Sequence, residues 1–133
     1  MPFELFTRQR PPAVREPALT IQKQGSLSLN RAAYEALDSP EAAELLFDRD
    51  ERRIGIRKAD PSADHAMPVR PLGRGGSSWL ISGRTFTIIY EIPTESARRW
   101  LAQTVDDMLV VDLKEPGTDV SGPRSRERAT SAG

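Results

Sequence analysis

The chain has 133 residues, of which 38% are hydrophobic and 29% are charged, and 19 Lys and Arg residues balance 19 Asp and Glu residues. The lack of cysteine excludes disulfides, thiolate catalysis and Cys-ligated zinc, and a single histidine, His65, excludes a His-rich metal centre within one copy. The length fits one domain or two very small ones, and no apolar run approaches the roughly 18 residues that a membrane-spanning helix needs. Because the start also lacks the pattern of a signal peptide, we expect a cytoplasmic protein without a membrane partner.

Both ends differ in composition from the middle of the chain. Residues 7–17 hold three prolines and three arginines, and residues 117–133 contain a single large aliphatic side chain, Val120. Such segments bury too little apolar surface to offset the entropy that ordering costs. The sequence therefore predicts a disordered Pro/Arg-rich arm over 1–17, a disordered tail over 117–133, and an ordered region between them.

The first half of the ordered region, residues 18–60, predicts strands around a short helix. Asn30 is a good N-cap, because its side-chain oxygen can accept hydrogen bonds from the first helical turn. The expected elements are strands near 19–21 and 27–29, a helix near 31–38, and strands at 44–47 and 53–57 joined by a turn at 48–51. Ser39-Pro40-Glu41 is also a good helix start, so a helix through 42–48 is the alternative; the alternation that resumes at 53–57 favours the strand.

A turn-rich linker at 61–65 leads to a second half, residues 66–116, with a similar order of elements. We expect a strand near 67–69, a strand at 79–81, a helix near 83–91 capped by Ser82, and a hairpin of 98–105 with 108–113. The shared order favours duplication of one unit. The alternative is two unrelated stretches with the same layout.

The first unit resembles the AbrB-type swapped-hairpin unit. Gly25, the alternating strand before Asn30, Leu37 at the helix end and the hairpin over 44–57 carry the resemblance, and the doubled arrangement resembles MraZ-type proteins. The resemblance implies a mostly β fold in which two pseudo-symmetric β-β-α-β-β units form one swapped-hairpin barrel. Three positions depart from the family pattern, since Gln22, Ser26 and Asn30 replace Asp, Arg and Pro. The Asp and Arg belong to the DNA-binding surface of the family, so their replacement bears on DNA binding more than on the fold.

One unit of this size is too small to bury its apolar faces alone, so the two units should share a core. Tyr34 and Phe86 should occupy equivalent places and pack the two helices against it. The inward-facing side chains are expected to be Leu19, Ile21, Leu27, Leu29, Leu45, Phe47, Ile54 and Ile56 from the first unit and Trp79, Ile81, Leu101, Val105, Leu109 and Val111 from the second.

Five basic residues fall in the strand-connecting loops or at the starts of the two helices, where acidic residues are scarce. They are Lys23, Arg31, Arg70, Arg74 and Arg84. If the units pair about a pseudo-two-fold axis, these side chains could share one face and neutralise phosphates of double-stranded DNA. The hypothesis is a small non-enzymatic DNA-binding regulator; the alternative for the five residues is solvated surface charge.

Other candidate sites favour structural explanations. His65 beside Asp64 is interpreted as a surface histidine, and the acidic turns at 48–51 and 106–107 as hairpin turns rather than cation sites. Gly73-Arg-Gly-Gly76 lacks the ending of a phosphate-binding loop and is interpreted as a strand connection. No catalytic, metal or cofactor site is therefore expected.

The second hypothesis for function is a protein-interaction or assembly module, with a protein partner or a homo-oligomer. Its anchors would be Trp79, Trp100 and Phe6, because aromatic residues dominate interface energetics.

Overall fold

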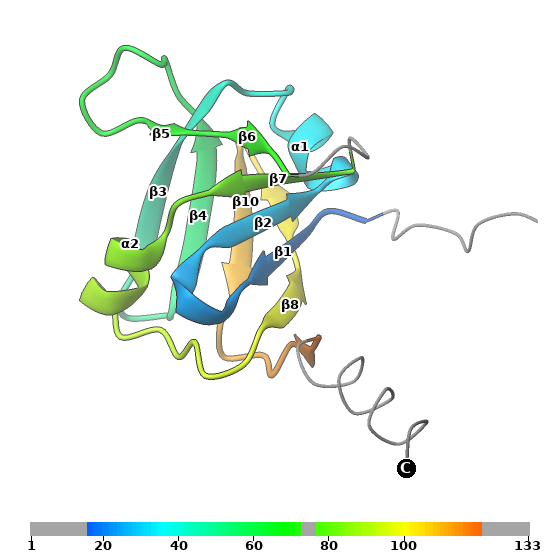
Figure 1. Ribbon diagram of the computed structural model, residues 1–133, viewed down its shortest axis with the longest axis vertical. Helices are drawn as coiled ribbons and strands as arrows, with labels where there is room; N and C mark the ends of the chain where they lie inside the picture. Colours follow the sequence, from blue (N-terminus) through cyan, green and yellow to red (C-terminus); the bar gives the residue numbers. More distant parts are fainter. Residues whose placement is uncertain (1–15, 73–76, 121–133) are drawn as a thin grey trace, which may run out of the picture.

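The computed structural model describes residues 16–72 and 77–120 (Figure 1). Over these ranges the chain is mostly β, with 43% strand and 15% helix, in two antiparallel sheets. Sheet A, ordered β11-β8-β1-β2-β7-β6, consists of β1 (Ala18–Ile21), β2 (Leu27–Asn30), β6 (Arg70–Pro71), β7 (Ser78–Ile81), β8 (Arg98–Leu101) and β11 (Thr118–Asp119). Sheet B, ordered β5-β3-β4-β10-β9, consists of β3 (Ala42–Asp48), β4 (Arg53–Lys58), β5 (Met67–Pro68), β9 (Gln103–Val105) and β10 (Met108–Asp112).

Three short helices complete the fold: the 3-10 turn η1 (Lys23–Gly25), α1 (Arg31–Ala36) and α2 (Arg84–Ile89). In Figure 1 sheet A lies in front of sheet B, and α1 and α2 lie at opposite ends of β2 and β7. The two helices expected near 31–38 and 83–91 are thus confirmed. The strand expected at 44–47 is also confirmed as part of β3, and the helical alternative for 42–48 is wrong.

The core lies between the two sheets. As expected, Leu19, Leu29, Ile54 and Ile56 are fully buried, whereas Phe47 is only partly buried. Tyr34 and Phe86 both pack against this core from their helices, although their equivalence stays a prediction.

Leu101 and Val105 are not core residues, contrary to expectation. Their side chains are 58% and 45% exposed, while Trp100 and Ala102 are buried. The expected single strand over 98–105 is divided at Ala102 into β8, in sheet A, and β9, in sheet B. The inward side chain of β8 is Trp100, opposite Leu19, and Val105 lies opposite Met108 on the outer face of sheet B.

The N-caps of the two helices differ. Asn30 caps α1 as predicted, because its Oδ1 accepts a hydrogen bond from the backbone N–H of Ala33 at 2.9 Å. Ser82 does not cap α2; the N-cap is Gly83, without a side-chain hydrogen bond. A side chain at Gly83 would lie 2.8 Å from the carbonyl oxygen of Gly25, so the close packing of α2 on η1 requires glycine there.

The strands of the described residues form two separate sheets and do not close into the single barrel that was expected. β11 pairs with β8 although it lies within the segment 117–133 assigned above to the tail. Residues 121–133 of that segment, and residues 1–15 of the N-terminal arm, lie outside the described residues.

Candidate nucleic-acid interface

Lys23 and Arg84 lie at one end of sheet A. Lys23 begins η1 and Arg84 begins α2, and both side chains are exposed. A side chain at Gly25 would lie only 2.9 Å from the Cα of Arg84, so the backbones of η1 and α2 are in close contact. The structure thus brings the elements that carry these two basic residues together.

Arg31 lies at the opposite end of β2, as the first residue of α1. The four residues of β2 separate it from η1, which is about 13 Å of extended chain. Its guanidinium carbon is 5.7 Å from the ring centre of Trp79, and its Nη1 is 3.8 Å from Oε2 of Glu35. Since both members of this ion pair are mostly exposed, the pair is weak.

Arg70 lies on the outer face of sheet A, which we define as the face turned away from the core. It is opposite Leu80 in β7, and residues directly opposite each other in a sheet share a face. The neighbours of Leu80 on either side, Trp79 and Ile81, are buried, so Leu80 and Arg70 point outward. The row continues across all six strands as Arg70, Leu80, Ser28, Thr20, Arg99 and Thr118.

Arg99 therefore belongs to the same face, and the sequence analysis missed it. The sequence analysis expected Leu101 to face inward, which would turn Arg99 inward as well. Trp100 is instead the inward residue of β8, so its neighbour Arg99 points outward. Arg74, by contrast, lies outside the described residues. The predicted basic residues that are described thus divide between the two ends of sheet A and its outer face, instead of forming one compact cluster.

A shallow hollow of about 500 Å³ lies on the outer face between Arg31 and Arg99. Its floor consists of small residues from three neighbouring strands, mostly with hydroxyl or amide groups: Ala18, Thr20, Ser28, Asn30 and Ser78. Two guanidinium groups beside hydroxyl groups suit an oxyanion such as a phosphate, since arginine offers paired N–H donors. Glu35 also lines the hollow and partly offsets its positive charge.

Asn30 holds the floor of the hollow in place. Its Oδ1 accepts hydrogen bonds from the N–H groups of Ala18 and Ala33, and its Nδ2 donates to the carbonyl oxygen of Glu16 at 2.9 Å. One side chain thus links the start of β1 to the end of β2 and the first turn of α1. Because Arg31 is the next residue, the bonds of Asn30 also hold the backbone of Arg31 in place.

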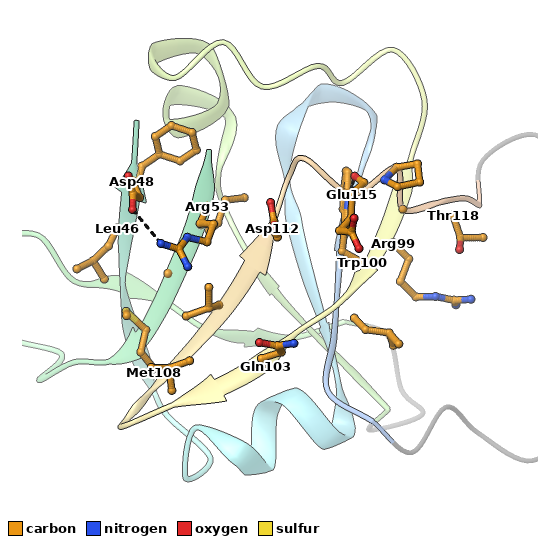
Figure 2. Close-up of a pocket in the computed structure, with 18 residues that line it drawn as sticks. Leu46, Asp48, Arg53, Arg99, Trp100, Gln103, Met108, Asp112, Glu115 and Thr118 are labelled. Carbon is orange, nitrogen blue, oxygen red and sulfur yellow. Dashed lines mark hydrogen bonds and ion pairs between the residues drawn. The ribbon is translucent and has the colours of Figure 1, made fainter. Parts of the chain in front are cut away.

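A larger groove of about 1050 Å³ lies beside sheet B (Figure 2). It is bounded by the outer face of sheet B and by β8 and β11. Its lining combines exposed apolar side chains with Asp48, Arg53, Asp112 and Glu115. Arg99 lines both hollows.

Comparison with models of known protein families, with characterised proteins and with solved structures finds no match to the chain. The arguments about function therefore depend on the two surfaces themselves.

Two of the three proposed aromatic anchors of an interaction surface are buried. Trp79 and Trp100 are 8% and 9% exposed, and Nε1 of Trp100 donates to the carbonyl oxygen of Glu115 at 2.8 Å. Both side chains fill the core because they alternate inward on β7 and β8. Phe6 lies outside the described residues.

His65 pairs with Glu44 across the surface of β3, and not with its neighbour Asp64. Glu44 also accepts a hydrogen bond from Nε of Arg57 at 2.6 Å. The bonds from Arg57 and then from His65 hold the pKa of Glu44 below its ordinary value. A carboxylate stabilised in this way is a poor general base.

The structure shows the acidic turn at 48–51 as a hairpin turn, in which Oδ1 of Asp48 accepts from the N–H of Glu51 at 3.0 Å. Within residues 16–72 and 77–120 no three acidic or histidine side chains gather as metal ligands would. No helix in the same ranges is long and apolar enough to cross a membrane.

Proposed function

We propose that this protein binds double-stranded DNA, without catalysis, by contacting phosphates with the outer face of sheet A. The observation that carries the proposal is the hydroxyl-floored hollow between Arg31 and Arg99, with Arg70 on the same face. When guanidinium groups on one face neutralise phosphates, the DNA releases counterions, and this release favours binding even for a protein whose net charge is zero.

The basic residues at the ends of sheet A extend this face. Lys23 and Arg84 lie beyond one end of β2 and Arg31 beyond the other, so the basic groups flank the face at separations of about 13 Å or more. The phosphates of one DNA strand recur about every 3.4 Å along the helix axis, so such groups can reach different phosphates along a duplex. These contacts would position the protein rather than identify bases.

The order of the strands supports the resemblance to tandem swapped-hairpin proteins. In each sheet two strands of the first half lie beside two strands of the second half. The order is β1-β2-β7-β6 in sheet A and β3-β4-β10-β9 in sheet B. The halves also exchange pairings, because β1 pairs with β8 and β3 pairs with β5. We infer that the two halves are divergent copies of one AbrB/MraZ-like unit, and that the protein acts as a regulator.

Titration of a fluorescently labelled duplex at several salt concentrations tests this proposal. If Arg31, Arg70 and Arg99 contact phosphates, the slope of log K against log salt should be near −3, because each contact contributes about −0.9, and contacts by Lys23 and Arg84 would bring it to about −4.5. Replacing Arg31, Arg70 or Arg99 with Ala should reduce the slope by about one contact each. Lys58→Ala is a matched control, because Lys58 is exposed on β4 and pairs with Asp38 away from this face. Failure to bind at low salt, or an unchanged slope in all three variants, would contradict the proposal.

A protein-interaction or assembly module is the second candidate. The groove beside sheet B favours it, because a concave surface with apolar and charged parts is typical of a binding site. The balanced net charge also fits this candidate better than it fits a dedicated DNA-binding domain.

A further inference from the structure

The groove beside sheet B has an apolar part built on a glycine. Gly55 lies opposite Leu46 on one side and Val110 on the other, so all three share the outer face of sheet B. A side chain at Gly55 would lie 2.6 Å from the sulfur of Met108, which shows that Met108 lies across this position. Because Gly55 has no side chain, Met108 can lie across it and form part of the apolar floor of the groove.

Two of the most exposed large apolar side chains of the described residues border this part. Leu101 is 58% exposed and Val105 is 45% exposed, and both line the groove together with Met108 and Val110. Apolar surface that remains exposed in a concave site marks a binding surface more often than isolated apolar residues do.

The other end of the groove is charged. Asp48 and Asp112 both lie opposite Arg53, so the three form one row across sheet B. Asp48 pairs with Arg53 and Asp112 pairs with Lys114, each at 3.4 Å, but both pairs are largely exposed and therefore weak. Backbone hydrogen bonds, from Glu51 to Asp48 and from Lys114 to Asp112, are the main reason why the pKa values of both carboxyl groups are lowered. Both are therefore ionised at neutral pH, and Glu115 adds a further carboxylate to the lining.

The spacing between the apolar and charged parts matches an extended peptide. Val110 and Asp112 are two residues apart on the same face of β10, which is about 7 Å. An extended ligand has the same repeat, so its side chains at alternate positions would contact the two parts in turn. Gln103 lies opposite Val110, beside the apolar part, where its amide can bond to a peptide backbone.

We propose that this groove binds an extended peptide segment of a partner protein, with a large apolar residue two positions from a lysine or arginine. The apolar side chain packs among Leu101, Val105 and Val110, and the basic side chain pairs with Asp112 and Asp48. The lining has three carboxylates, of Asp48, Asp112 and Glu115, against the guanidinium groups of Arg53 and Arg99. This charge disfavours a phosphate backbone and favours a cationic ligand.

The test uses fluorescein-labelled peptides and the full chain. The probe is a decapeptide of threonine, serine and glycine that carries one phenylalanine and, two positions later, one arginine. In one control peptide glutamate replaces the arginine, and in the other serine replaces the phenylalanine. Fluorescence anisotropy should show that the protein binds the probe at least about tenfold more tightly than either control.

Variants of the protein locate the binding. Leu101→Ser and Val105→Ser change exposed side chains, so they should fold, and each should weaken probe binding about tenfold. Asp112→Asn keeps an acceptor for the N–H of Lys114 but removes the charge, so it should reduce the preference for arginine over glutamate. Ile88→Ser is the matched control, since Ile88 is exposed on α2, outside the groove.

Equal binding of the three peptides, absence of probe binding at about 1 mM, or normal binding by Leu101→Ser and Val105→Ser would each overturn the proposal. The same groove variants should bind duplex DNA as the unchanged protein does. Failure of the peptide proposal is therefore distinguishable from failure of the DNA proposal.

Discussion

Tyr34 lies flat against Trp79, with their ring centres 3.9 Å apart and their planes 5° from parallel. The stack joins α1 to β7, and the guanidinium of Arg31 lies near the same indole ring. A side chain of the core thus determines where a basic residue of the candidate DNA-binding face is held.

Tyr34→Ala should lower the free energy of unfolding by about 2–3 kcal/mol, because it removes a partly buried ring and its stacking. It should also weaken DNA binding, since α1 and Arg31 lose their support. Urea denaturation and DNA titration measure the two effects. Tyr34→Phe keeps the ring and should retain both properties; a loss as large as that of Tyr34→Ala would contradict this role.

Phe86→Ala should lower the free energy of unfolding by about 2–3 kcal/mol. Phe86 packs edge-on against Tyr90, with ring centres 5.1 Å apart, and against Phe47 at 6.0 Å, but it is only partly buried. The cost should therefore fall below that of a fully buried phenylalanine. Ile88→Ala on the same helix is the control; because Ile88 is 62% exposed, its unfolding midpoint in urea should hardly change.

Gly25→Ala should destabilise the protein much more than Gly55→Ala does. Gly25 has φ of 95°, and a Cβ there would lie 2.6 Å from Oγ1 of Thr87 and 2.9 Å from the Cα of Arg84. Because the backbone of α2 cannot yield easily, we expect a loss of about 2 kcal/mol or more. At Gly55 the closest atom is the sulfur of Met108, which can rotate away, so the loss should be below about 1 kcal/mol. Similar thermal midpoints of the two variants would refute this contrast.

Glu44→Gln should make stability less dependent on pH in the acid range. The pKa of Glu44 is lowered in the folded protein, chiefly by the hydrogen bond from Arg57 and then by that from His65. Its contribution is therefore fully present above the unfolded pKa of about 4.3 and is lost as the pH falls through the folded pKa.

Thermal midpoints measured from pH 7 to pH 3 should show Glu44→Gln below the unchanged protein at neutral pH, with the difference shrinking as the pH falls. Asp64→Asn changes an exposed carboxylate beside His65 and serves as control. A constant difference between Glu44→Gln and the unchanged protein at all pH values would contradict the assignment.

Local patterns were sufficient to predict many of the elements. The cap at Asn30, the strand at 44–47 and the turn at 48–51 depend on residues close together in the chain, and all three were predicted. The exposure of Leu101 and Val105 was not predicted, because both alternate sets of side chains in 98–105 contain apolar residues. Only the pairing of Trp100 with Leu19, a contact between distant parts of the chain, shows which set faces inward.

The candidate DNA-binding face was predicted only in part for a similar reason. The basic residues near the helix starts could be found by position, but Arg99 joins them only through its pairing with Thr20, which no local pattern indicates. The groove combines Leu46, Gly55 and Leu101, which are distant in the chain and carry no shared motif.

The exchange of strands between the two halves also determines how the molecule can assemble. β1 has its partner β8 in the second half, with Ala18 opposite Leu101, and β3 of the first half pairs with β5 of the second. The edge strands of the first half cannot find their partners before the second half has been synthesised. The pairing of β1 with β8 must bring together segments that are separated by most of the domain. Folding that depends on such distant pairings is slow, in the range of milliseconds to seconds. During this interval the nascent first half exposes unpaired strand edges, which makes it the stage most open to aggregation and to capture by chaperones.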